Sequence, residues 1–228
     1  PFFPTKGSEL LLSVTATPPY SLWDGKDYKN LATNYQSANY QAEAKEKYRW
    51  IEYNKWKFKF RSFTGLMGIT KTPVLMTRVE FGILGSYNRY KTSPFEAFYV
   101  GGDGTSGYSS GYATETIALR GYDNGSLAGS ASSNAYAYSR MTLELRYPVM
   151  MQTSTSIYAL AFLEGGNAWT NIKDFNPFDM KRSAGVGVRI LLPMVGLLGV
   201  DWAYGFQKYI NGQKVGGSQF HFIIGQEF

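Results

Sequence analysis

Residues 55–61 read Lys-Trp-Lys-Phe-Lys-Phe-Arg, so that Trp56, Phe58 and Phe60 alternate with cationic side chains. Successive side chains of a β-strand point to opposite faces, so this run would place its aromatic groups on one face and its charges on the other. The pattern predicts a strand with one apolar and one polar face. A soluble sheet and a membrane barrel with a wet lumen both fit this description, so the run alone does not distinguish them.

The same alternation recurs along the chain in segments that are separated by turn residues. Near residue 143, for example, Leu143 and Leu145 alternate with Thr142, Glu144 and Arg146. Segments of about ten residues with this period are typical of the strands of outer-membrane barrels. Eight strands are predicted in this way, at residues 8–17, 47–63, 74–90, 135–147, 154–165, 183–192, 197–209 and 218–228.

The connections between these segments alternate in length. The first, third, fifth and seventh connections are long, whereas the second, fourth and sixth are short. Outer-membrane barrels have long extracellular loops and short periplasmic turns, so the alternation favours a membrane barrel over a soluble sandwich. We therefore predict an all-β fold, an antiparallel transmembrane β-barrel with eight strands in this chain and with both termini at the periplasmic side.

Composition excludes other classes of protein. Hydrophobic residues make up 44% of the chain, but no run approaches the roughly 18 apolar residues that a membrane helix needs. The absence of cysteine fits an oxidising compartment. The net charge is +6, but the charges alternate with aromatic residues rather than forming a basic patch, so no nucleic-acid partner is expected. The first residues, Pro-Phe-Phe-Pro, do not resemble a signal peptide, and we interpret the chain as a fragment.

The predicted loop at residues 91–134 contains a short motif, Leu119-Arg120-Gly121-Tyr122. A tight turn of this kind can project the Arg120 guanidinium into a polar lumen, where carboxylates could bind it in bidentate fashion. Glu144, on the polar face of the fourth strand, and Glu164, near the end of the fifth, are the candidate partners. The alternative interpretation is a disordered surface loop.

Several motifs resemble the BamA family of outer-membrane insertases, also called the bacterial surface antigen D15 family. Leu119-Arg120-Gly121-Tyr122 is similar to the Val-Arg-Gly-Phe/Tyr motif at the tip of the family's sixth extracellular loop. The C-terminus resembles the family's β-signal, which is recognised during insertion. The β-signal residues would be Phe220, Phe222, Ile224, Gly225 and Phe228. Further similarities lie at residues 3–8, 98–102, 163–169 and 183–197. One departure is Glu164, where the family usually has Asp.

This resemblance implies that residues 1–228 form about the ninth to the sixteenth strand of a larger barrel, without its first half and its periplasmic POTRA domains. It implies that Glu144 and Glu164 hold Arg120. It also implies a protein of the bacterial outer membrane that folds and inserts β-barrel proteins, with lipids, client barrels and accessory lipoproteins as partners and no cofactor. Because lipid does not tolerate unpaired strand edges, we expect the eight strands either to close on themselves or to pair with a second copy.

Two other functions remain open at this stage. A polypeptide-secreting pore of the two-partner secretion type would share the Arg-Gly-Tyr loop, and only the upstream region would distinguish it. An outer-membrane hydrolase would need a base beside a nucleophile, but the chain has one histidine, His221, and no visible triad. The chain is therefore expected not to be an enzyme. With one histidine and no cysteine, no transition-metal site is expected either, although Asp103 and Asp123 could bind calcium weakly.

Overall fold

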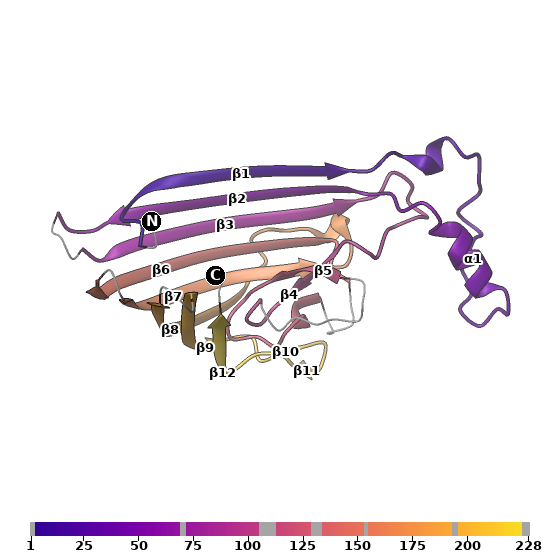
Figure 1. Ribbon diagram of the computed structural model, residues 1–228. Coiled ribbons are helices and arrows are strands. Elements are labelled where there is room, and N and C mark those ends of the chain that lie inside the picture. Colours follow the sequence, from indigo (N-terminus) through magenta and orange to yellow (C-terminus); the bar gives the residue numbers. More distant parts are fainter. Residues whose placement is uncertain are drawn as a thin grey trace.

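The computed structural model describes residues 3–68, 72–104, 113–128, 134–152, 155–192 and 196–224. Most of the chain forms one antiparallel sheet in which neighbours in sequence are neighbours in space. Its strands are, in order, β1 (Lys6–Ala16), β2 (Asn54–Gly65), β3 (Val74–Gly85), β6 (Ala137–Met151), β7 (Ser156–Trp169), β8 (Lys181–Leu192), β9 (Gly196–Gly205) and β12 (Ser218–Ile224). The eight predicted strands are therefore confirmed (Figure 1).

The bounds of several strands differ from those predicted, and the largest differences are the start of the second strand and the end of the third. The second strand begins at Asn54 rather than at residue 47, because residues 48–53 form a turn, bends and irregular backbone. These residues follow the helix α1 (Tyr40–Lys47). Its sequence is rich in the helix formers Ala, Glu, Lys and Gln, with Glu43 in the first turn and lysines in the last, which suits the helix dipole. The third strand ends at Gly85, five residues before the predicted end at residue 90.

Burial is inverted relative to a soluble sheet. On β6, Thr142, Glu144 and Arg146 are buried, whereas Leu143, Leu145 and Tyr147 are 45%, 43% and 53% exposed. On β3, likewise, Arg78 and Glu80 are among the buried residues. A soluble sandwich would bury the leucines instead. Charges inside and apolar side chains outside are the arrangement of a membrane barrel, which settles the choice that the alternation alone left open.

The sheet is open. Its order ends at β1 on one side and at β12 on the other, and no pairing between these two strands occurs among the described residues. The expectation of a closed eight-stranded barrel is therefore wrong. An eight-stranded barrel has an interior just wide enough for side chains, whereas the concave side of this sheet also holds a folded loop. The other expected arrangement, pairing with a second copy, stays a prediction.

The long connections carry their own structure. The connection from β3 to β6 contains β4 (Ala97–Val100), β5 (Ala113–Ile117) and the 3-10 turn η2 (Ser126–Ala128), and β4 and β5 pair in parallel. The connection from β1 to β2 holds η1 (Tyr20–Leu22) and α1, the connection from β7 to β8 holds η3 (Ile172–Asp174), and the connection from β9 to β12 holds the hairpin of β10 (Tyr209–Ile210) and β11 (Gln213–Lys214). Figure 1 shows α1 beyond the end of β1, whereas β4 and β5 lie beneath the sheet on its concave side.

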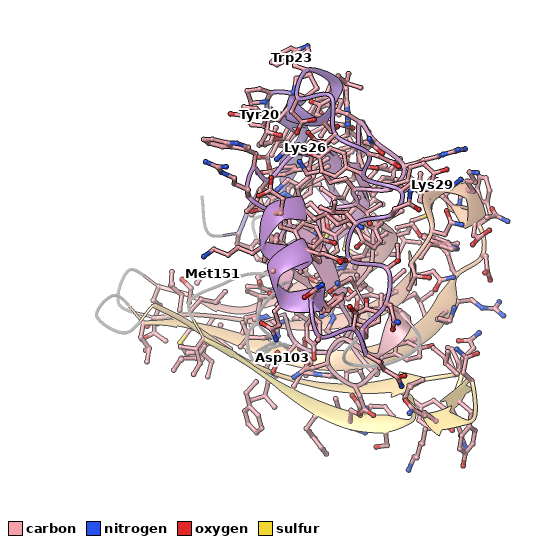
Figure 2. The ribbon with its side chains drawn as sticks, turned by 90° about the vertical axis from the view of Figure 1, so that its right-hand side faces the viewer. Tyr20, Trp23, Lys26, Lys29, Asp103 and Met151 are labelled. Atoms are coloured by element: carbon pink, nitrogen blue, oxygen red, sulfur yellow. The ribbon has the colours of Figure 1, made fainter. Side chains whose placement is uncertain are left out.

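The loop between β1 and β2 projects furthest. Figure 2 looks at this end of the molecule, where Tyr20, Trp23, Lys26 and Lys29 lie above the strands and Asp103 lies lower, near the sheet. The ring of Tyr20 stacks on that of Trp50, at 5.3 Å between centroids. None of the described helices is long and apolar enough to cross a membrane.

Candidate functional site

Arg120 is the centre of a buried ion cluster on the concave side of the sheet. Its Nη2 lies 2.9 Å from Oε1 of Glu164 and 3.1 Å from Oε2 of Glu144, and its Nη1 lies 2.9 Å from Oδ2 of Asp201. The backbone N–H of Arg120 also donates to Oε2 of Glu164, at 3.0 Å. The Arg120 side chain is fully buried. Three strands, β6, β7 and β9, thus each supply one carboxylate to one guanidinium.

Each of these carboxylates also binds a second arginine. Glu164 accepts from Arg140 at 2.8 Å and from the hydroxyl of Thr142 at 3.1 Å. Glu144 accepts from Nε of Arg146 at 2.7 Å. Asp201 holds Arg189 through both of its oxygens, at 2.6 and 2.8 Å. Because buried charges are costly unless paired, this sharing is what allows so many charges inside the sheet.

The guanidinium of Arg120 also lies on an aromatic face. Its central carbon is 3.4 Å from the centroid of the Phe162 ring, which is a cation–π contact. Gly185 pairs with Phe162 across β7 and β8, and a side chain at Gly185 would lie 2.4 Å from the ring. The glycine therefore leaves the space that the ring needs, and the ring forms a floor under Arg120.

Gly121 brings the loop backbone into contact with the sheet. It has a φ of +87°, and an added Cβ would lie 2.7 Å from the backbone nitrogen of Gly205 on β9. Only glycine combines this backbone conformation with so close an approach. The N–H of Gly121 donates to Nε2 of His221 on β12, at 2.9 Å.

The flanking residues of the motif complete the anchoring. Leu119 is buried and exchanges two backbone hydrogen bonds of 3.1 Å with Gly102. The Tyr122 hydroxyl lies 2.6 Å from the carbonyl oxygen of Arg182 and 2.7 Å from the side chain of Gln207. We call Leu119–Tyr122 the loop tip. It contacts strands from both halves of the sheet, and so it acts as a brace across the concave face.

The sequence profile of the Omp85 superfamily domain matches residues 2–228, which is nearly the whole chain. The chain belongs to the Omp85 superfamily. No curated protein sequence matches it. Among solved structures, it is similar to the crystal structure of BamA from Haemophilus ducreyi lacking POTRA domains 1–3, with a TM-score of 0.61 and 20% sequence identity. The match covers 98% of this chain and 39% of that one, so the Omp85 chain described here spans well under half of the BamA structure.

The predicted site residues of this Omp85 chain fall into two groups. The structure brings Arg120 together with Glu144 and Glu164, as expected from the sequence, and the longer side chain of Glu164 reaches both the backbone and the guanidinium of Arg120. On β12, Phe220, Phe222 and Ile224 point outward and are 68%, 64% and 71% exposed. Gly225 and Phe228 lie outside the described residues.

Asp201 and His221 are the site residues that sequence reasoning missed. Asp201 stands on the polar face of β9 among Gly199, Ala203 and Gly205, so a lone carboxylate on an otherwise uncharged face was the available signal. His221, considered above only as a possible catalytic base, lies directly opposite Asp201 in the pairing of β12 with β9. The two residues link the Omp85 loop tip to the last two strands of the sheet.

In the part of the chain that the structure describes, no three His, Cys, Asp or Glu side chains group so that they could hold a metal ion. Asp123, one of the two residues considered for calcium, instead accepts a hydrogen bond from Gln219 at 2.6 Å. The loop tip is therefore a site for holding strands in place, and its chemistry is that of ion pairs and hydrogen bonds.

Proposed function

We propose that this chain is the C-terminal part of an insertase barrel, which folds β-barrel proteins and inserts them into the bacterial outer membrane. One observation carries the proposal. Among the residues that the structure describes, β12 has β9 as its strand partner, while the loop tip contacts it from the concave side. An exposed strand edge is a template for pairing with another strand, so β12 offers an incoming client a row of backbone donors and acceptors.

The outward face suits a lipid environment. Leu10, Leu12 and Val14 on β1 are exposed, as are Phe220 and Phe222 on β12. Exposed apolar rows of this kind on a sheet with a charged interior are stabilised by lipid chains rather than by water. Outer-membrane lipids are thus the first proposed partner. Client β-barrel proteins, which would pair at the strand edge, are the second, and accessory lipoproteins of the full-length protein are the third.

The mechanism needs no bond chemistry, and we propose that the chain is not an enzyme. The backbone N–H and C=O groups of a client strand would replace their hydrogen bonds to water with hydrogen bonds to β12. The apolar side chains of the client would enter lipid beside Phe220 and Phe222. The driving free energy is that of barrel formation, in which all backbone groups become paired inside the membrane. The insertase lowers the barrier by presenting a strand edge at the correct depth.

The alternative function is a polypeptide-secreting pore of the same superfamily. The concave side speaks against it, because the loop tip, β4 and β5 fill much of the interior and the buried arginines are all paired with carboxylates. A cavity between β2, β3, β5 and β6 has a volume of about 270 Å³ and is lined by charged residues such as Lys57, Glu80 and Arg140. A translocating polypeptide would have to displace the ion cluster.

The test is reconstitution of the full-length protein that contains this chain in vesicles of outer-membrane lipids. An unfolded β-barrel protein and an unfolded secreted polypeptide are offered separately, and folding is followed by heat modifiability and transport by protection from protease. The proposal expects faster folding of the barrel protein and no transport. Transport of the secreted polypeptide without any effect on barrel folding would assign the pore function instead.

A further inference from the structure

The terminal strand is held from inside the sheet by a histidine. His221 is 5% exposed, and its Nε2 accepts the hydrogen bond from the Gly121 N–H at 2.9 Å. Below it on the same inward face, Ile223 is buried near Ala118. Strand β12 has β9 as its only strand partner in the described sheet. The bond to the loop tip is thus a restraint on β12 in addition to its pairing with β9.

The donor of this bond is fixed independently of His221. Arg120, the neighbour of Gly121, is bound by carboxylates from three strands. Gly121 itself is packed on Gly205, and its positive φ aims the N–H at β12. The position of the Gly121 N–H is therefore set by contacts that do not involve His221.

The chemistry of imidazole makes the bond sensitive to protonation. A neutral imidazole has one acceptor nitrogen, and here the acceptor is Nε2. Protonation would turn Nε2 into a donor, which cannot accept from Gly121. The charged groups that face the ring are Asp201 from β9, Asp103 and Arg120 from the loop, and Glu164 from β7.

We propose that His221 is a positioning residue, through which the loop tip holds β12 against the sheet, and that release of its bond to Gly121 frees the terminal strand to pair with a client. The first half of this inference concerns the strand alone. The second half rests on the proposed insertase function. The two halves therefore need separate measurements.

The experiment compares hydrogen exchange of residues 218–224 in the full-length protein in lipid nanodiscs. His221→Phe removes the acceptor, His221→Gln supplies an amide oxygen in its place, and Ile223→Val trims an inward side chain on the same strand without touching the bond. Loss of one hydrogen bond should raise exchange of β12 several-fold, roughly up to tenfold, in His221→Phe. The Gln and Val variants should exchange like the wild type.

A pH titration gives a readout that simple packing would not move. After correction for the intrinsic exchange rate, acidification through the range where histidine titrates should raise β12 exchange in the wild type but not in His221→Gln. This titration needs no Phe variant, so it tests the inference even if His221→Phe does not fold. Wild-type exchange with no acid dependence, or equal exchange in the Phe and wild-type proteins, would overturn the positioning role.

Client folding is then measured in the same proteins. If the wild type folds clients, His221→Phe should change the folding rate while His221→Gln restores it. If β12 exchange responds as expected but the wild type folds no client, the positioning role stands and the insertase function fails. If the folding rate is the same in all variants despite altered exchange, the link between strand release and client pairing is wrong.

Discussion

Gly121 of the loop tip and Gly205 of β9 pack backbone to backbone. A Cβ added at Gly205 would lie 2.3 Å from the carbonyl oxygen of Gly121, and one added at Gly121 would lie 2.7 Å from the nitrogen of Gly205. Neither contact can be relieved by rotating a side chain, because both involve backbone atoms. The position of the loop tip therefore depends on the absence of one methyl group on β9.

We expect Gly205→Ala to push the loop tip away from the sheet. Overpacking of this kind costs about 1–3 kcal/mol, and the displacement would also lengthen the contacts of Arg120. The variant should show a lower temperature of heat modifiability and faster protease cleavage of the loop between β3 and β6. Gly68→Ala is the matched control, because a Cβ there has no atom within 4 Å. Equal protease resistance in both variants would contradict the close packing.

Removal of Arg120 should be strongly destabilising. Arg120→Ala leaves Glu144, Glu164 and Asp201 facing a space that held their shared cation, and breaking a buried pair in this way costs about 3–5 kcal/mol. Arg120→Lys should rescue only partly, since an ammonium group does not match three carboxylates as a planar guanidinium does. Urea unfolding in detergent measures both. Full stability of Arg120→Ala would show that the cluster is not the brace described here.

Asp201 and Arg120 should show strong coupling in a double-mutant cycle. Asp201→Asn weakens the contacts with Arg120 and with Arg189 together, whereas Arg120→Met removes a contact that Asp201 shares. The double variant should therefore be less destabilised than the sum of the single variants, by roughly 0.5–3 kcal/mol. Lys59→Met, on β2 and outside the Arg120 contacts, should be additive with Asp201→Asn. Additive effects of Asp201→Asn and Arg120→Met would show that the two residues do not interact energetically, which would contradict this prediction.

The loop between β1 and β2 should loosen at alkaline pH. The pKa of the Tyr28 hydroxyl is raised well above its usual value, by burial and by its hydrogen bond to Asp24. A raised pKa means that the contribution of neutral Tyr28 is present below pH about 10 and is lost as the pH rises through the folded-state value. Protease cleavage between residues 17 and 53, followed against pH, should rise in the alkaline range. In Tyr28→Phe this rise should be absent, and a pH profile unchanged by the substitution would rule out Tyr28 as the cause.

Alternation was enough to predict the eight strands because the period of two is a local property of the backbone. Alternation could not predict whether the apolar or the polar face is buried, because the pattern around Leu143 and Glu144 would be the same in a soluble sheet. It also extended the second strand too far, into residues 48–53, where the alternation is interrupted at Trp50 and Ile51 and the backbone forms a turn, bends and irregular structure. Closure failed as a prediction because it depends on what fills the interior.

The loop-tip motif and its two glutamates could be predicted because the resemblance names them. Asp201 and His221 could not, since their roles depend on pairing: only the register of β9 with β12 places one opposite the other. The polar faces of the predicted strands show which carboxylates could contact Arg120. Which of them do so depends on the curvature of the sheet. This information is not contained in any short stretch of sequence.

The hydrogen-bonding and ion-pair partners of Arg120 and Gly121 described above all follow these two residues along the chain. Glu144, Glu164 and Asp201 come 24, 44 and 81 residues after Arg120, and His221 comes 100 residues after Gly121. Contacts that close longer stretches of chain cost more entropy and form later in folding. The charge of Arg120 therefore has none of these three carboxylate partners until β6, β7 and β9 have formed and paired. The bond between Gly121 and His221 needs β12 in its register with β9, so we expect this bond to form only after these two strands have paired.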